Sequence, residues 1–67
     1  MNIGAYVIDS RDGRIGRVMA RVGPYVQLRP PGGGREWDCP VEELTPASVG
    51  DVLRARVRAI NRESRLP

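Results

Sequence analysis

The chain has 67 residues, of which 40% are hydrophobic and 28% charged, and its formal net charge is +3. A chain of this length buries only about 60% of the surface that it exposes when unfolded, so we expect one domain, a small core and no cavity for a sizeable substrate. One cysteine and no histidine exclude an internal disulfide and a metal site built from Cys and His. We therefore expect no metal and no cofactor.

The apolar residues favour a compact β-structure. Val, Ile and Leu dominate, Phe is absent, and the only aromatic residues are Tyr6, Tyr25 and Trp37. This composition favours a small β-barrel or sandwich capped by a helix. The sequence shows neither a signal-peptide pattern nor an apolar run of about 18 residues, so we expect a cytoplasmic protein.

The basic residues are all arginine, a usage that favours a GC-rich bacterial genome. Their distribution is uneven. Residues 1–50 carry six Arg and six acidic residues and are neutral, whereas residues 51–67 carry five Arg against Asp51 and Glu63. The whole excess of +3 therefore lies in the C-terminal segment.

The N-terminal half predicts three strands. The first spans residues 3–9 and ends at a turn with the pair Asp12-Gly13, and the second spans residues 15–22. The Gly23-Pro24 pair then reverses the chain into a third strand over residues 25–29. In the second strand the period of two places Val18, Ala20 and Val22 on the apolar face and Arg17, Met19 and Arg21 on the other.

The next segment begins with the glycine-rich loop of residues 30–34. We expect a fourth strand over residues 36–40, in which Trp37 belongs to the core and Cys39 is a small buried apolar residue. A single helical turn over residues 41–44 and a very short fifth strand at residues 44–45 complete the β-rich part.

A C-terminal helix is expected within residues 46–64. Its start is signalled either by Thr45 with Pro46 or by Ser48 with Asp51. At 100° per residue, an apolar stripe suited to docking on the β-structure is formed by Val49, Leu53, Val57 and Ile60. A row of arginines lies roughly opposite this stripe, formed by Arg54, Arg58, Arg62 and Arg65.

The strands and the helical turn before the last strand describe an SH3-like barrel. The segment from Gly4 to Val18, with a Gly-containing turn and then Gly16 and Val18, resembles the pattern of KOW and Tudor-like domains. The segment from Trp37 to Leu44 is similar to the fourth strand and helical turn of such barrels. The resemblance covers residues 3–45 and implies a five-stranded barrel in which Gly16 lets the second strand curl. Because this fold serves many interaction modules, it does not define a function.

The first functional hypothesis is a non-catalytic module that binds DNA or RNA. Guanidinium groups contact phosphates and exposed aromatic rings stack on bases. The candidate residues are Arg17, Arg21, Tyr25, Arg29, Arg54, Arg58, Arg62 and Arg65. The competing interpretation is that the strand arginines are solvated and paired with Glu36, Asp38, Glu42 and Glu43.

The second hypothesis is a protein-interaction module, an adaptor or regulatory subunit, that docks on an acidic protein partner through the sheet edge or the C-terminal helix. Homo-oligomerisation through the helix is a variant of it. An enzyme is not expected, because the candidate acids and bases fall on predicted exposed turns and strand faces, where pKa values stay ordinary. These candidates are Asp9, Asp12, Glu36 and Asp38.

Overall fold

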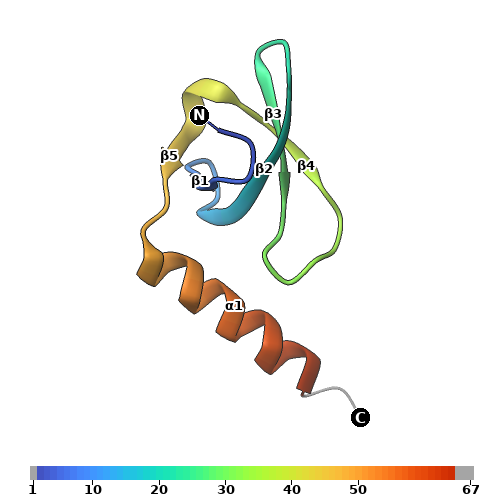
Figure 1. Ribbon diagram of the computed structural model, residues 1–67, viewed down its shortest axis with the longest axis vertical. Coiled ribbons are helices and arrows are strands. Elements are labelled where there is room, and N and C mark those ends of the chain that lie inside the picture. Colours follow the sequence, from blue (N-terminus) through green and yellow to red (C-terminus); the bar gives the residue numbers. More distant parts are fainter. Residues whose placement is uncertain (1, 65–67) are drawn as a thin grey trace.

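The computed structural model describes residues 2–64, which form a mainly β protein with one C-terminal helix. Five antiparallel strands form one sheet in the order β4-β3-β2-β1-β5 (Figure 1). The elements are β1 (Tyr6–Asp9), β2 (Arg14–Val22), β3 (Tyr25–Arg29), β4 (Trp37–Pro40), the 3-10 turn η1 (Val41–Glu43), β5 (Leu44–Pro46) and α1 (Val49–Ser64). Each predicted strand is present, although β1 begins three residues later than expected.

The turns follow the local sequence. After β1, the N–H of Gly13 donates to the carbonyl of Asp9 over 2.8 Å, and Gly13 adopts a φ of 79°. Glycine suits this position because it alone adopts a positive φ without steric cost. The second reversal consists of Gly23 and Pro24 alone, since β2 ends at Val22 and β3 begins at Tyr25.

The core lies on one face of the sheet. Its buried members are Val7, Val18, Val26, Leu28 and Cys39, and Trp37, Val41 and Leu44 pack against them. Cys39 is thus buried, as predicted. The close approach of two core groups explains Gly16, where a Cβ would lie 2.8 Å from the Cβ of Leu28 and 2.9 Å from the Trp37 ring. Gly16 is therefore required for packing.

The prediction for the apolar face of β2 is wrong in its second half. The register between β2 and β3 shifts between Val18 and Ala20, which marks a β-bulge. A bulge adds one residue to one strand and so exchanges the faces of the residues after it. Val22 is consequently paired with Tyr25, away from the core, and is 61% exposed.

The helix starts at the second of the two predicted signals. Ser48 and Asp51 form a reciprocal cap, in which the Asp51 N–H donates to the Ser48 hydroxyl and the Ser48 N–H donates to the Asp51 carboxylate. The alternative start at Thr45 and Pro46 is wrong, because these residues belong to β5 and pair with β1.

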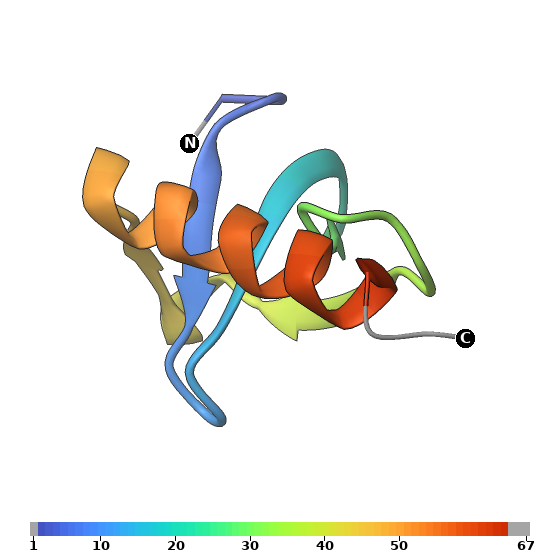
Figure 2. The same cartoon turned by 90° about the horizontal axis from the view of Figure 1, so that it is seen from below.

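The orientation of α1 also differs from the prediction. α1 crosses β1 and β2, and its C-terminal end lies near the loop between β3 and β4 (Figure 2). The half-buried residues of its sheet-facing side include Val52 and Ala55, whereas Leu53, two residues and about 160° away from Ala55, is 55% exposed. The predicted apolar stripe therefore faces away from the sheet. Within residues 2–64 no helix is long and apolar enough to cross a membrane.

Candidate nucleic-acid interface

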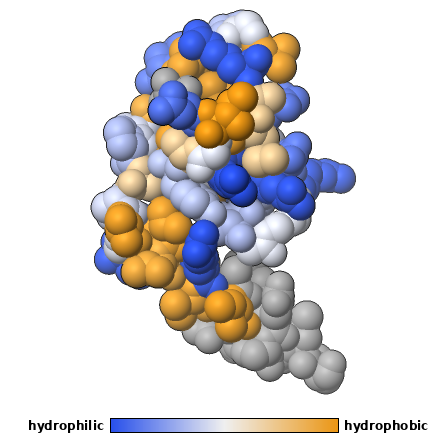
Figure 3. All heavy atoms as spheres, in the orientation of Figure 1, coloured by the Kyte–Doolittle hydropathy of each residue, from blue (hydrophilic) through white to orange (hydrophobic). Residues whose placement is uncertain are grey.

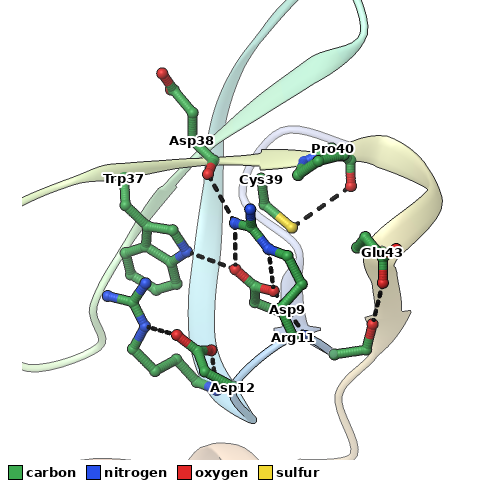
Figure 4. A network of polar contacts seen from close by, with 10 residues as sticks. Asp9, Arg11, Asp12, Trp37, Asp38, Cys39, Pro40 and Glu43 are labelled. Carbon is green, nitrogen blue, oxygen red and sulfur yellow. Dashed lines mark hydrogen bonds and ion pairs between the residues drawn. The ribbon is translucent and has the colours of Figure 1, made fainter.

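A buried carboxylate at the end of β1 organises the polar interior (Figure 4). Asp9 has no exposed surface, and its carboxylate accepts hydrogen bonds from the Arg11 guanidinium at 2.9 and 3.0 Å. It also accepts bonds from the backbone N–H of Arg11 and from the indole N–H of Trp37, both at 3.0 Å. Arg11 in turn donates to the carbonyl of Asp38 at 3.0 Å, so the network ties the β1–β2 turn to β4.

The electrostatics of this network are those of a structural ion pair. The Arg11 hydrogen bonds hold the pKa of Asp9 well below its usual range, against the opposing effect of burial, and the Trp37 bond acts in the same direction. The same contact raises the pKa of Arg11. The prediction that Asp9 is exposed with an ordinary pKa is therefore wrong. A carboxylate that stays ionised at neutral pH and accepts four bonds is unsuited to general acid or base catalysis.

Cys39 lies beside this network. Burial raises the pKa of its thiol, and the neighbouring Asp9 carboxylate adds to the effect. The thiol donates to the carbonyl of Pro40 at 3.4 Å. A buried protonated thiol is a poor nucleophile, so Cys39 is a packing residue.

The ion pairs leave several arginines without an acidic partner. Across residues 2–64 the pairs are Arg11–Asp9, Arg14–Asp12 and Arg54–Asp51. None involves a strand arginine together with Glu36, Asp38, Glu42 or Glu43. The interpretation that these acids neutralise Arg17, Arg21 and Arg29 thus finds no ion pair in the described part of the chain. Glu43 instead accepts a hydrogen bond from Ser10.

Two of the predicted strand arginines lie side by side. Arg17 of β2 is directly opposite Arg29 of β3, and on its other side Arg17 is opposite Tyr6 of β1. Residues directly opposite one another project to the same face of a sheet, so the three form one line across three strands. Both arginines are exposed.

A third arginine reaches this line from α1. The Arg56 guanidinium donates to the Tyr6 hydroxyl at 2.9 Å and lies 5.5 Å from the centroid of the Tyr6 ring. We call Tyr6, Arg17, Arg29 and Arg56 the sheet arginine surface. Sequence reasoning missed Tyr6 and Arg56. The hairpin register after Asp12-Gly13 signals the pairing of Tyr6 with Arg17, but the position of Arg56 depends on how α1 docks.

The remaining strand candidates divide between the two faces. Tyr25 is 48% exposed and, by the alternation of β3, projects to the same face as Arg29. Arg21 follows the bulge and is opposite Val26, a core residue, so it lies on the other face. Its guanidinium donates to the carbonyl of Gly23 at 3.3 Å. The structure therefore brings Arg17, Arg29 and Tyr25 to one face and removes Arg21 from it.

The helix candidates occupy a different place. Arg54 and Arg58 line an open groove of about 680 Å³ between α1, the β1–β2 turn and the loop of residues 30–33. Arg14 and Trp37 line the same groove, with the Arg14 guanidinium 4.1 Å from the centroid of the indole ring. None of the four residues of the sheet arginine surface lines this groove. The Arg62 side chain and Arg65 lie outside the part of the chain that is described.

Acidic side chains partly neutralise this groove. Asp12 and Asp51 line it together with the arginines, and they form ion pairs with Arg14 and Arg54. Hydrogen bonds from the backbone and hydroxyl of Ser48, followed by the bond from Arg54, lower the pKa of Asp51. The groove is thus less favourable for a polyanion than the sheet arginine surface.

No group of three or more potential metal ligands is found among the described residues. No protein-family model matches the chain, and no curated protein and no solved structure is significantly similar to it.

Proposed function

We propose that this protein is a non-catalytic module that binds nucleic acid, DNA or RNA, through the sheet arginine surface. The observation that carries the proposal is that one face of the sheet, the face of Tyr6, brings together three exposed arginines without an acidic partner among the described residues, namely Arg17, Arg29 and Arg56. The proposal refines the sequence hypothesis, because it keeps Arg17 and Arg29, adds Arg56 and excludes Arg21.

Electrostatics favour an anionic ligand at this surface. Arg17 and Arg29 are directly opposite one another, and like charges at such positions are unfavourable in a sheet. A phosphate between the two guanidinium groups would replace this repulsion by charge-assisted hydrogen bonds. A chain of phosphates supplies such groups at regular intervals, which makes nucleic acid a suitable partner.

Aromatic side chains on the same face support the choice. Tyr25 is 48% exposed and its ring is open to stacking, whereas Tyr6 is half-buried and has the Arg56 guanidinium 5.5 Å from its ring centroid. Base stacking on tyrosine is tolerant of sequence. Binding through phosphates and stacking should therefore show little sequence preference and fall steeply as the salt concentration rises.

We also propose that the sheet is an SH3-like barrel of the KOW or Tudor-like type. This is supported by the five-stranded order, by the central hairpin of β2 and β3, and by the 3-10 turn η1 directly before β5. A Tudor-type aromatic cage is not favoured, because Trp37 projects to the face of Leu28, whereas Tyr6 and Tyr25 project to the opposite face.

The test is a titration of fluorescein-labelled 20-nucleotide oligo(dT), oligo(U) and mixed-sequence duplex DNA, followed by fluorescence polarisation at 50 and 200 mM salt. We expect Arg17→Gln/Arg29→Gln to weaken binding at least about tenfold at low salt. We also expect it to reduce the salt slope by about 1.4 for a single strand, the share of two phosphate contacts.

The matched control is Arg21→Gln/Arg35→Gln, which removes the same charge from exposed residues outside the sheet arginine surface. We expect this control to change the affinity by less than about threefold. Equal losses in the two double variants would show that net charge alone drives binding. No binding of the unchanged protein at 50 mM salt would refute the proposed function.

A further inference from the structure

The face of the sheet that carries the sheet arginine surface also has an uncharged line of side chains. Val22, Tyr25 and Pro40 are directly opposite one another on β2, β3 and β4. Residues in such positions project to the same face, so the three form one line across these strands. Val22 is 61% and Tyr25 48% exposed, and Pro40 is half-buried beside them. We call these three residues the hairpin apolar platform.

The hairpin apolar platform lies on the face of Arg17 and Arg29 but at the other end of β3. Tyr25 and Arg29 are four residues apart in this strand, which separates the two lines by roughly 13 Å along it. Figure 3 shows hydrophobic side chains beside strongly hydrophilic ones over the β2–β3 hairpin, in the orientation of Figure 1. The hairpin therefore offers guanidinium groups at one end and an open aromatic ring at the other.

The side chains between the two lines carry no cation. Ala20, Gln27 and Asp38 are opposite one another there, and Asp38 is exposed. Asp38 forms no ion pair within residues 2–64, so its carboxylate repels phosphates from the β4 side of this face. A polyanion thus finds its phosphate contacts at Arg17 and Arg29, and the platform must contact another part of the ligand.

The part of a nucleic acid that suits the platform is an unpaired base. Aromatic side chains stack on the faces of single-stranded bases, whereas in a duplex those faces are covered by the neighbouring base pairs. A duplex laid on the platform would place its phosphates and sugars against Val22 and Tyr25, and polar groups lose hydration against apolar side chains. The platform therefore favours a single strand.

The β-bulge in β2 gives a geometric reason for the same choice. The register shift between Val18 and Ala20 lies between the two lines. A bulge bends its strand and increases the local twist, so the platform is turned relative to the line of Arg17 and Arg29. Duplex DNA has a persistence length of about 150 base pairs and stays straight over so short a distance. A single strand bends freely enough to contact both lines.

We propose that this face binds single-stranded DNA or RNA in preference to duplex, with phosphates at Arg17 and Arg29 and an unpaired base stacked on Tyr25. The inference rests on the proposed function, since it assigns the form of nucleic acid that the sheet arginine surface takes. Val22 and Pro40 border the base with apolar groups, so the aromatic face of the base is recognised and its hydrogen-bonding edge is not.

The test separates contacts to bases from contacts to phosphates. The labelled probes are 20-nucleotide oligo(dT) and oligo(U), an abasic DNA strand with the same phosphates as oligo(dT), and duplex DNA of 20 base pairs. Fluorescence polarisation at 50 mM salt gives the affinity for each, and oligo(dT) and oligo(U) distinguish DNA from RNA as the source of the strand. We expect both to bind at least about fivefold more tightly than the abasic strand and the duplex.

The decisive variant is Tyr25→Ala, in which oligo(dT) and the abasic strand should bind within about twofold of one another. Tyr25→Phe should keep the preference of the unchanged protein, because its ring still presents an aromatic face. The matched control is Leu53→Ala, which removes an exposed side chain of α1 and should also keep the preference. The circular dichroism of each variant should match that of the unchanged protein, since both residues are exposed.

Three results would overturn the inference while leaving the proposed function in place. They are equal affinities of the unchanged protein for oligo(dT) and the abasic strand, a duplex that binds as tightly as the single strands, and a preference for oligo(dT) over the abasic strand that Tyr25→Ala retains. The first two need no variant, so they decide the question even if Tyr25→Ala does not fold. No binding of any probe would refute the proposed function and this inference with it.

Discussion

The sheet and α1 place similar residues in opposite environments. In the sheet, Leu28 is fully buried between Val18 and Trp37 of the neighbouring strands, while in α1 Leu53 is 55% exposed. The buried Asp9 is paired with Arg11, whereas Arg56 on the helix bonds only to a tyrosine hydroxyl among the described residues. The core face of the sheet encloses its apolar side chains and neutralises the buried carboxylate, whereas α1 exposes a line of aliphatic side chains and an arginine that has no acidic partner among the described residues.

This difference teaches where the stability of the fold is located. A buried core with a satisfied carboxylate provides the free energy of folding, because apolar burial and charge-assisted hydrogen bonds are the large favourable contributions. α1 is held by a few contacts at its sheet side, so its exposed face adds little to folding. The two regions should therefore respond very differently to the same substitution.

The first prediction compares the same substitution, leucine to alanine, in the sheet and in α1. The largest effect is expected in the sheet. Leu28→Ala should lower the free energy of unfolding by about 3 kcal/mol, because it removes a fully buried side chain and leaves a cavity. Leu53→Ala should change it by less than about 0.5 kcal/mol, because the side chain is already hydrated. Urea unfolding followed by the fluorescence of Trp37, the single tryptophan, measures both.

Equal losses in the two variants would contradict the comparison, since they would mean that the apolar stripe of α1 is covered in solution. The slope of the unfolding curve should stay the same in both, because neither substitution changes the surface exposed on unfolding by much.

The sequence predicts the sheet well because its signals are local. The Gly23-Pro24 turn and the alternation of β3 fix a hairpin with no help from the rest of the chain, and both are confirmed. The short turn η1 and β5 are also present where the pattern indicates them. Ser48 with Asp51 is a local cap and marks the true start of α1.

What the sequence does not predict depends on tertiary packing. The bulge after Val18 has no residue signature, yet it moves Val22 out of the core and Arg21 away from Arg17 and Arg29. The same limit applies to the rotation of α1, because periodicity finds an apolar stripe but does not say whether the sheet or another molecule covers it. Arg56 was missed as part of the candidate site for that reason.

At Asp9, too, tertiary packing decides an outcome that the local sequence pattern does not predict. A carboxylate beside a turn is ordinarily exposed, and only the meeting of Arg11, Trp37 and the backbone of the turn makes its burial favourable. The hydrogen bond from Trp37 joins residues 28 positions apart. The residues near Asp9 in the sequence therefore signal neither this bond nor the burial of the carboxylate.

The second prediction tests this network. Asp9→Asn should lower the free energy of unfolding by about 2–3 kcal/mol, because an amide cannot replace an ionised acceptor of bonds from Arg11. Asp12→Asn is the control, since Asp12 also pairs with an arginine but is partly exposed, and it should cost less than about 0.5 kcal/mol. Thermal unfolding at pH 7 compares the two.

The pH dependence follows from the direction of the Asp9 shift. Its pKa in the folded state lies below that of the unfolded chain, about 3.9, so the stabilisation is complete above about pH 4 and is lost as pH falls through the folded pKa. The difference between the unchanged protein and Asp9→Asn should therefore shrink on acidification. A difference that is constant between pH 7 and pH 2 would show that the pKa of Asp9 is the same in the folded and in the unfolded protein, which would contradict the predicted shift.

The smallest expected effect is the sharpest test of how the two regions are joined. Ser48→Ala removes the hydroxyl that accepts the Asp51 N–H, and it should destabilise the start of α1 by about 1 kcal/mol. Because α1 contributes little to the sheet, this loss should appear as faster amide exchange at Asp51 and Val52 with an unchanged Trp37 unfolding midpoint. If the midpoint falls by the same free energy instead, α1 and the sheet unfold as one cooperative unit. The exposed stripe would then belong to an element that the fold itself requires.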